Sequence, residues 1–142
     1  MSKAAGLSNA GPTTSRDPRR ASRHGAAPLV AVKWGVADAL ELHITAPNAD
    51  QAATMARALV EERLCACVNI VPGVRSIYRY DDKIWDEPEV LCVAKTRPAL
   101  FERVCERVFE LHPYDVPEIL AFNVDDGSPA YLAWLKDATT LE

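Results

Sequence analysis

The sequence predicts an α+β fold of the ferredoxin-like kind, a βαββαβ sandwich with an extended central hairpin and a further helix at the C-terminus. Two observations carry this prediction. Segments with strand periodicity alternate with two amphipathic helical segments in that order. The 142 residues, 49% of them hydrophobic, suffice for one domain with a real core and are too few for two of ordinary size.

The first strand and helix are expected over residues 39–46 and 48–63. Leu40, Leu42 and Ile44 alternate with polar residues, which is typical of a half-buried strand, and Pro47 ends it. Asn48 lies three residues before Gln51, which resembles a capping box. Apolar residues then recur at helical spacing, at positions 52, 55, 56, 59, 60 and 64.

A long hairpin is expected next. Residues 67–71 and 74–80 have strand character, and Pro72-Gly73 between them indicates a bend or bulge. Asp81-Asp82 forms a tight turn, and residues 84–96 return as the second strand, with Pro88 as a local irregularity.

The second half of the chain completes the order. Pro98 opens a helix whose buried stripe ends at His112-Pro113, and residues 119–124 form the last strand. Ser128-Pro129 begins a short C-terminal helix that carries Tyr131, Trp134 and Leu135.

Residues 1–37 differ in composition from the rest and are predicted to be a disordered N-terminal extension, with the folded domain over residues 38–142. This segment is rich in Gly, Ala, Ser, Pro and Arg, a bias that an organelle transit peptide would also have. It holds six of the 16 basic and one of the 20 acidic residues, so it carries +5 and the remainder −9. An acidic domain repels phosphate backbones, so nucleic acid is not an expected partner.

The hairpin is longer than the domain that it leaves. Two strands of about 14 residues span roughly 45 Å, whereas the helix over residues 48–63 spans roughly 24 Å. Ile77, Tyr80, Ile84 and Trp85 lie on the overhanging part and are too apolar for a free ribbon. We therefore expect pairing with other copies of the chain in a closed cyclic assembly. A shorter hairpin with an irregular loop over residues 72–75 is the alternative.

Several short motifs then occur in an order and spacing that resemble the CutA family. They are residues 45–47 (TAP), 67–73 (CVNIVPG), 76–80 (SIYRY), 95–97 (KTR), 112–118 (HPYDVPE) and 131–135 (YLAWL). The resemblance implies a ferredoxin-like homotrimer, a link to tolerance of copper and other divalent metals, and a fold related to the trimeric PII signalling proteins. The chain departs from some members at Tyr80, Ile44 and Leu111, where these carry Trp, Cys and His.

Cys67 and His112 are the candidate metal ligands. Thiolate and imidazole suit copper or zinc, although two ligands leave the ion short of partners unless Cys65, Glu118 or a neighbouring chain contributes. Cys65 lies two residues before Cys67 and is expected on the same side of an extended segment. The alternatives are that both cysteines are small core residues and that His112 bonds the end of its helix.

Lys95, Tyr114, Glu118 and Tyr78 are the candidate ligand-binding residues of a cleft between subunits. Tyr114 and Glu118 lie with His112 at a helix-to-strand junction, where functional loops often occur. Lys95 ends an apolar strand and is expected to reach toward an anion or toward Glu118; the alternative is a strand-end lysine directed to solvent.

No catalytic motif accompanies these residues. The sequence has no Gly-rich phosphate loop, HExxH, GxSxG or CxxC. We expect a non-enzyme with no required cofactor, and two functions stay open: a copper- or divalent-metal-binding homotrimer, and a PII-like sensor or scaffold for a small ligand. A hydrolase using Cys67 and His112 is a distant third. No apolar run approaches the ~20 residues of a membrane span, and no apolar signal sequence precedes the cysteines, so the expected compartment is the cytoplasm.

Overall fold

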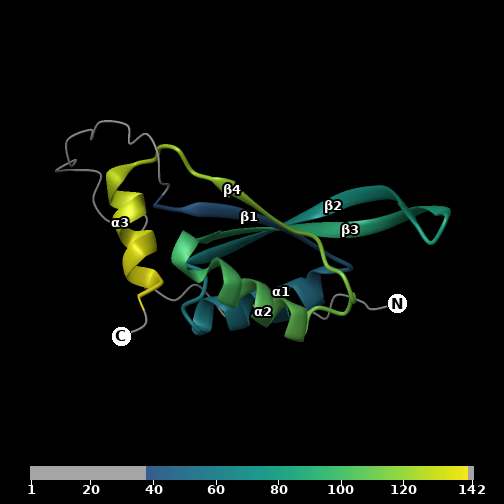
Figure 1. Ribbon diagram of the computed structural model, residues 1–142, viewed down its shortest axis with the longest axis horizontal. Coiled ribbons are helices and arrows are strands. Elements are labelled where there is room, and N and C mark those ends of the chain that lie inside the picture. The colour runs from purple at the N-terminus through teal and green to yellow at the C-terminus, as the bar shows by residue number, and fades with distance from the viewer. Residues whose placement is uncertain (1–37, 141–142) are drawn as a thin grey trace, which may run out of the picture.

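The computed structural model describes residues 38–140 and shows one antiparallel sheet with two helices on one face and a third helix at one end (Figure 1). The elements follow the predicted order. They are β1 Leu40–Ala46, α1 Ala49–Glu61, β2 Cys67–Tyr80, β3 Lys83–Thr96, the 3₁₀ turn Pro98–Leu100, α2 Phe101–Leu111, β4 Ile119–Asn123 and α3 Pro129–Ala138. The prediction of disorder over residues 1–37 lies outside the described residues.

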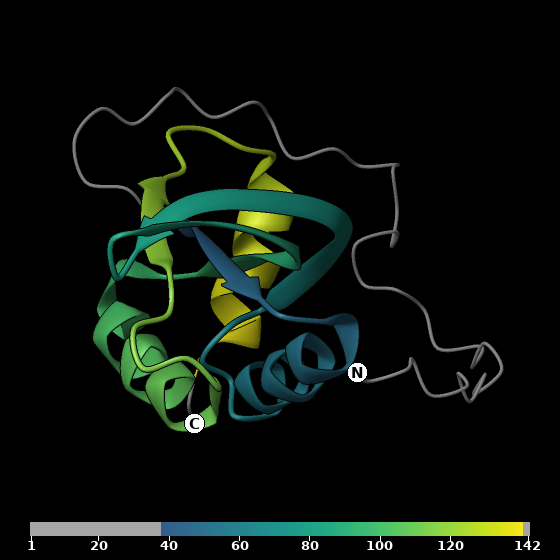
Figure 2. The same ribbon diagram turned by 90° about the vertical axis from the view of Figure 1, so that its right-hand side faces the viewer.

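The sheet has the strand order β2-β3-β1-β4, with every neighbouring pair antiparallel. Both long connections carry a helix that packs on the same face, as Figure 2 shows along the length of the sheet. This is the predicted ferredoxin-like arrangement. β2 and β4 are the two edge strands within the single chain.

The core lies between the sheet and α1 and α2. Alternate β1 residues, Leu42 and Ile44 among them, are completely buried there and pack with Leu59 of α1 and Val104 and Val108 of α2. α1 begins at Asn48, whose side chain accepts a hydrogen bond from the Gln51 amide at 2.9 Å, as the capping pattern predicts. It ends two residues earlier than expected, because Arg63 takes a left-handed conformation with φ 60°.

The hairpin extends well beyond the domain. All seven residues of β1 pair with Val90–Thr96, so the first half of β3, residues 83–89, pairs only with β2. The predicted bulge is confirmed by a register shift between Val71 and Val74, with Gly73 at φ 85°. Pro88 stays in register opposite Arg75, so the irregularity expected there does not occur.

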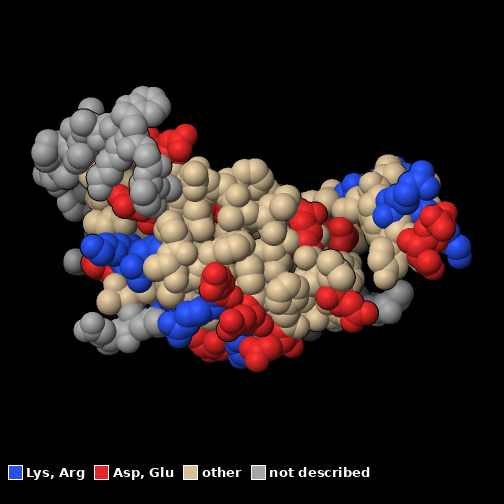
Figure 3. Space-filling view, in the orientation of Figure 1, with Lys and Arg blue, Asp and Glu red and all other residues tan. Residues whose placement is uncertain are grey.

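α3 packs at the opposite end of the sheet from the hairpin tip (Figure 1). Its Leu135 is buried with Ala39 and Ala66 in a second, smaller cluster. The acidic side chains gather along the surface over α1 and α2, whereas the hairpin tip carries both signs of charge (Figure 3). No helix among residues 38–140 is long and apolar enough to cross a membrane.

Candidate functional site

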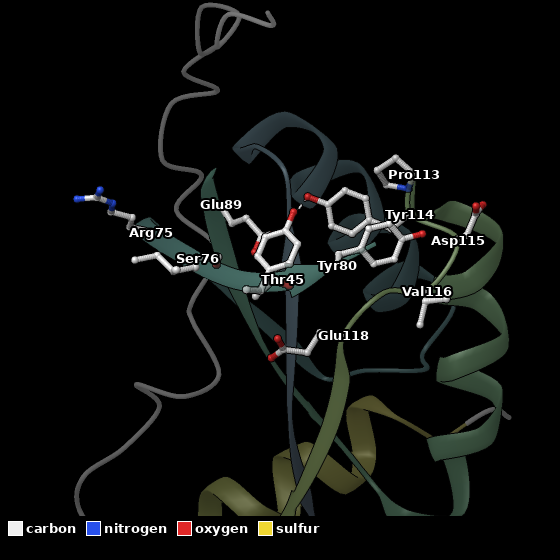
Figure 4. Close-up of a pocket in the computed structure, with 12 residues that line it drawn as sticks. Thr45, Arg75, Ser76, Tyr80, Glu89, Pro113, Tyr114, Asp115, Val116 and Glu118 are labelled. Atoms are coloured by element: carbon white, nitrogen blue, oxygen red, sulfur yellow. Dashed lines mark hydrogen bonds between the residues drawn. The ribbon is translucent and has the colours of Figure 1, made fainter. Parts of the chain in front are cut away.

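A cavity of about 810 Å³ lies where the overhanging hairpin leaves the domain (Figure 4). Three parts of the chain meet there: the β2 half of the hairpin, the end of β1 with the neighbouring part of β3, and the loop between α2 and β4. The lining residues are Thr45, Glu89, residues 75–78 and 80, and residues 113–116 and 118. A volume of this size is typical of small-molecule sites.

His112 fixes the start of the loop that lines the cavity. Its backbone amide still donates to the Val108 carbonyl at 2.8 Å, but its own backbone is extended, with φ −82° and ψ 139°, and this ends α2. Its imidazole Nδ1 accepts from the Tyr114 amide at 3.1 Å, and its Nε2 lies 2.7 Å from the Thr45 carbonyl oxygen. Because an amide only donates and a carbonyl only accepts, both bonds require the neutral ring with its proton on Nε2. Both nitrogens of this buried ring are thus already used.

Tyr114 and Glu89 form the most buried polar pair of the cavity. The Tyr114 hydroxyl donates to Glu89 Oε2 at 2.9 Å, and Glu89 is only 9% exposed. Burial, followed by the Glu89 hydrogen bond, raises the pKa of Tyr114 well above its ordinary value. Burial and the neighbouring Glu87 and Glu89 also raise the pKa of Tyr78. The tyrosines therefore stay protonated and act as hydrogen-bonding groups and aromatic walls.

The cavity is negatively charged. Glu89, Asp115 and Glu118 contribute three carboxylates, and Arg75 is the one basic residue among its lining. The Arg75 guanidinium is already engaged in a bidentate pair with Asp86, at 2.8 and 2.7 Å. An anionic ligand would therefore find little to neutralise it here.

Three of the four predicted cleft residues come together at this cavity, and the fourth does not. Tyr78, Tyr114 and Glu118 line it. Lys95 pairs across the sheet with Cys67 and Glu41, and its ammonium group bonds the Asn69 side chain. It therefore lies near the α3 end of β3 and does not reach Glu118 within the chain. The sequence could not show this, because the alternation of side chains along a strand specifies a face of the sheet and not a position along it.

The structure also does not bring Cys67 and His112 together within one chain. Cys67 pairs with Lys95, which in turn pairs with Glu41 of β1. His112 instead bonds Thr45, which lies four residues, or roughly 13 Å, further along β1 than Glu41. This separation excludes a Cys67–His112 catalytic dyad within the chain. Among residues 38–140, no group of three or more His, Cys, Asp and Glu side chains is arranged to hold a metal ion.

Cys65 and Cys67 lie on opposite sides of the sheet, contrary to expectation. Cys65 is completely buried in the core under α1 and α2, and burial raises the pKa of its thiol to about 12. Cys67 is partly exposed and shares the other face with Asn69, whose side-chain oxygen lies 3.9 Å from its sulfur. The two-residue spacing would place both thiols on one side only if both lay in a strand, and β2 begins at Cys67. The Cys65 amide still bonds the Leu59 carbonyl at the end of α1.

Sequence reasoning missed Glu89, the most buried acid of the cavity, and Thr45, whose carbonyl holds His112. The one signal for Glu89 was a carboxylate placed directly before the apolar run Val90, Leu91, Cys92, Val93. This signal did not point to a partner, because the hydrogen bond of Glu89 is to the distant residue Tyr114.

Known proteins match most of the described chain. The family model of the CutA1 divalent ion tolerance protein matches residues 41–138. The divalent-cation tolerance protein CutA of Thermus thermophilus is 50% identical over 96 residues, which is 68% of this chain and 93% of that protein. Chloroplastic CutA of Arabidopsis thaliana is 43% identical over 98 residues, 69% of this chain and 54% of the relative, so the match spans about half of that longer protein.

Solved structures agree with these matches. The Thermus thermophilus divalent cation tolerance protein superposes with a TM-score of 0.70 at 47% identity, covering 72% of this chain and 99% of that one. CutA1 of Oryza sativa gives 0.72 at 36% identity, covering 75% and 98%. The described fold, the motifs and these matches agree, and the chain belongs to the CutA1 divalent ion tolerance protein family.

Proposed function

We propose that this protein is a homotrimer that binds divalent metal ions, copper among them, and works in metal tolerance without catalysing a reaction. Family membership supports the role in divalent-cation tolerance. The observation that carries the assembly is the overhanging hairpin, which bears Ile77, Tyr80 and Ile84 with 64%, 63% and 61% of their surfaces exposed. Apolar residues in this number on a two-stranded ribbon favour burial against another copy.

The sheet edges support the same assembly. Among residues 38–140, no further strand pairs with the outer sides of β2 and β4, and the β4 residues Leu120 and Phe122 are 52% and 46% exposed. A closed ring of three copies would cover these edges and apolar side chains together.

A site with three or more ligands from residues 38–140 would have to be shared between copies. No single chain offers three suitable ligands among residues 38–140, and a metal needs more than two for tight binding. Cys67 is the best candidate ligand, because its thiol is partly exposed on the sheet face opposite the helices and thiolates bind copper strongly. His112 from another copy would have to exchange its bond with Tyr114 or Thr45 for the metal.

Metal titration of the full chain tests this proposal. We expect Zn²⁺ in calorimetry, and Cu⁺ in competition with a chelator, to bind with a stoichiometry set by the trimer and to bind at least about tenfold more weakly to Cys67→Ser. Cys105→Ser is the matched control, since this partly exposed thiol lies on α2. Unchanged metal affinity in Cys67→Ser and His112→Asn would show that both residues are structural.

The second candidate function is a PII-like sensor or scaffold that binds a small ligand in the cleft. The gathering of Tyr78, Tyr114 and Glu118 around one cavity of about 810 Å³ favours it. Equilibrium dialysis against adenine nucleotides and small cations separates these classes of ligand. The carboxylates of the cavity lead us to expect no retention of nucleotides.

The remaining partners follow from charge and thiol chemistry. We propose a cytoplasmic protein without nucleic-acid or membrane partners, because the domain is acidic and its cysteines are free thiols, two of them buried. Retention of the purified protein on a heparin column at 0.15 M salt would contradict this proposal.

A further inference from the structure

Glu89 has one carboxylate oxygen that is not used by the protein. Oε2 accepts the Tyr114 hydroxyl, and no other hydrogen bond or ion pair to Glu89 occurs within residues 38–140. Every side-chain oxygen and nitrogen of these residues that is shielded from solvent has a hydrogen-bond partner. Oε1 of Glu89 has none, so it must be accessible to solvent. Glu89 is one of the residues that line the cavity, which is where a ligand would meet this oxygen. Glu89 is only 9% exposed, and no basic side chain pairs with it among residues 38–140.

The surroundings of Glu89 supply further negative charge and no available cation. Asp115 and Glu118 line the same cavity (Figure 4), and the one lining guanidinium, Arg75, is held in a bidentate pair by Asp86. Glu87 and Glu89 together help to raise the pKa of Tyr78. A cationic ligand that enters the cavity from solvent would supply the opposite charge that residues 38–140 of the single chain do not provide.

The lining suits an organic cation better than a metal ion. The carboxylates do not form, with any His or Cys of residues 38–140, a group of three that could hold a metal. Three tyrosines, Tyr78, Tyr80 and Tyr114, line the space instead. Aromatic faces attract ammonium groups and cover their methylene or methyl carbons, and a cavity of about 810 Å³ holds a molecule rather than a bare ion.

We propose that this cavity binds a small organic ammonium ion, with Glu89 as its principal counter-ion and the tyrosines as the walls that contact its carbons. The proposal deepens the second candidate function, the small-ligand cleft, and rests on it. Asp115 and Glu118, both exposed at the opening, attract the cation and define which end enters first.

The test is saturation-transfer NMR and calorimetry on the full chain with two probes, 1,4-diaminobutane and tetramethylammonium, and with neutral 1,4-butanediol as the matched control ligand. We expect saturable binding of both cations and none of the diol. Glu89→Gln keeps an oxygen that accepts the Tyr114 hydroxyl but loses the charge, so it should weaken cation binding at least about fivefold. Glu106→Gln removes an exposed charge on α2 and should leave binding unchanged.

Glu118→Gln guards against a folding defect in Glu89→Gln, because Glu118 is exposed; it should weaken binding about twofold or more. Wild-type affinity in both variants would overturn the proposal. Equal binding of diol and diamine would overturn it while leaving the small-ligand cleft standing, and absence of binding by every probe would overturn both. The particle mass and the Zn²⁺ affinity of Glu89→Gln are measured as well. Wild-type values of both would show that a loss of ammonium binding in this variant does not come from a loss of assembly or of the metal site.

Discussion

The two ends of the sheet are completed in different ways. At one end α3 is held by its own chain: Arg97 donates to the Thr139 hydroxyl and carbonyl, both at 2.8 Å, and Arg63 donates to the Ala138 carbonyl at 3.4 Å. At the other end, the outer part of the hairpin beyond Glu89 has only local side-chain bonds among residues 38–140, the Arg75–Asp86 pair and the bond from the Trp85 indole to the Tyr80 carbonyl. One end is satisfied within the chain, and the other exposes apolar surface that favours a partner.

Substitution at the hairpin end should have the largest effect, loss of assembly. Ile77→Asp places a charge on a side chain that is 64% exposed in the single chain and, in our account, buried in the trimer. We expect the variant to elute and scatter as a smaller particle and to melt at a lower temperature.

Phe109→Asp is the matched control for Ile77→Asp. Phe109 is 55% exposed on α2, away from the hairpin, so the same change should leave the particle mass unaltered. Equal behaviour of the two variants would show that the hairpin has no special part in assembly. Trp85→Asp should resemble Ile77→Asp, with an added loss from the broken Tyr80 bond.

Substitution at the α3 end should cost stability without changing assembly. Arg97→Ala removes two hydrogen bonds to Thr139, which is completely buried, and we expect the free energy of unfolding to fall by about 1–2 kcal/mol in urea titration. Lys at this position makes no fork of two donors and should restore little of the loss. Arg103→Ala, exposed on α2, is the control and should stay within about 0.5 kcal/mol of wild type.

Alkaline pH should loosen the main core between the sheet and the helices α1 and α2. Burial raises the pKa of Cys65 to about 12 from an ordinary 9.0, and that of Cys92 to about 11. Below pH 9 the folded and unfolded chains both keep these protons, so their contribution to stability is complete. Between pH 9 and about 12 only the unfolded chain releases them, and the stability is lost as pH rises.

Urea unfolding at pH 8 and pH 10.5 measures this loss. Cys65→Ala should show a smaller fall in the free energy of unfolding between the two pH values than wild type does, because it removes one of the titrating groups. A fall that is the same in wild type and in Cys65→Ala would place the alkaline sensitivity elsewhere.

The smallest expected effect is at the tip of the hairpin. Asp81 and Asp82 have φ of 54° and 59°, a left-handed pair typical of a type I′ turn, in which glycine is favoured at the second position. Asp82→Gly should raise the free energy of unfolding by up to about 1 kcal/mol and leave the assembly intact. Asp82→Val, which resists this conformation, should lower it; a stabilising Val would show that the turn geometry differs.

The elements of the fold could be predicted because their signals are local. The alternation of Leu40, Leu42 and Ile44, the cap at Asn48 and the bulge at Gly73 each lie within a few residues of the structure that they specify. The overhang of the hairpin followed from comparing lengths, since strands of about 14 residues span roughly 45 Å and the helix over residues 48–63 spans roughly 24 Å.

The site was predictable only in part because it depends on register. The Tyr114 loop was recognised from its prolines and carboxylates, but its contact with Glu89 joins residues 25 positions apart. Lys95 does not reach Glu118 within the chain, and the sequence did not show this, since the alternation along β3 does not say which β1 residue lies opposite. The structure favours the structural interpretation of His112, because Tyr114 and Thr45 engage both of its nitrogens.

The mass of the native particle tests the central claim, that the hairpin end is completed by other copies of the chain. Light scattering of the purified full chain at micromolar concentration should give three times the 15.6 kDa chain mass, with no decrease on dilution to nanomolar concentration. A stable 15.6 kDa particle with native secondary structure would contradict the account, because the hairpin would then keep Ile77, Tyr80 and Ile84 exposed to water without a partner.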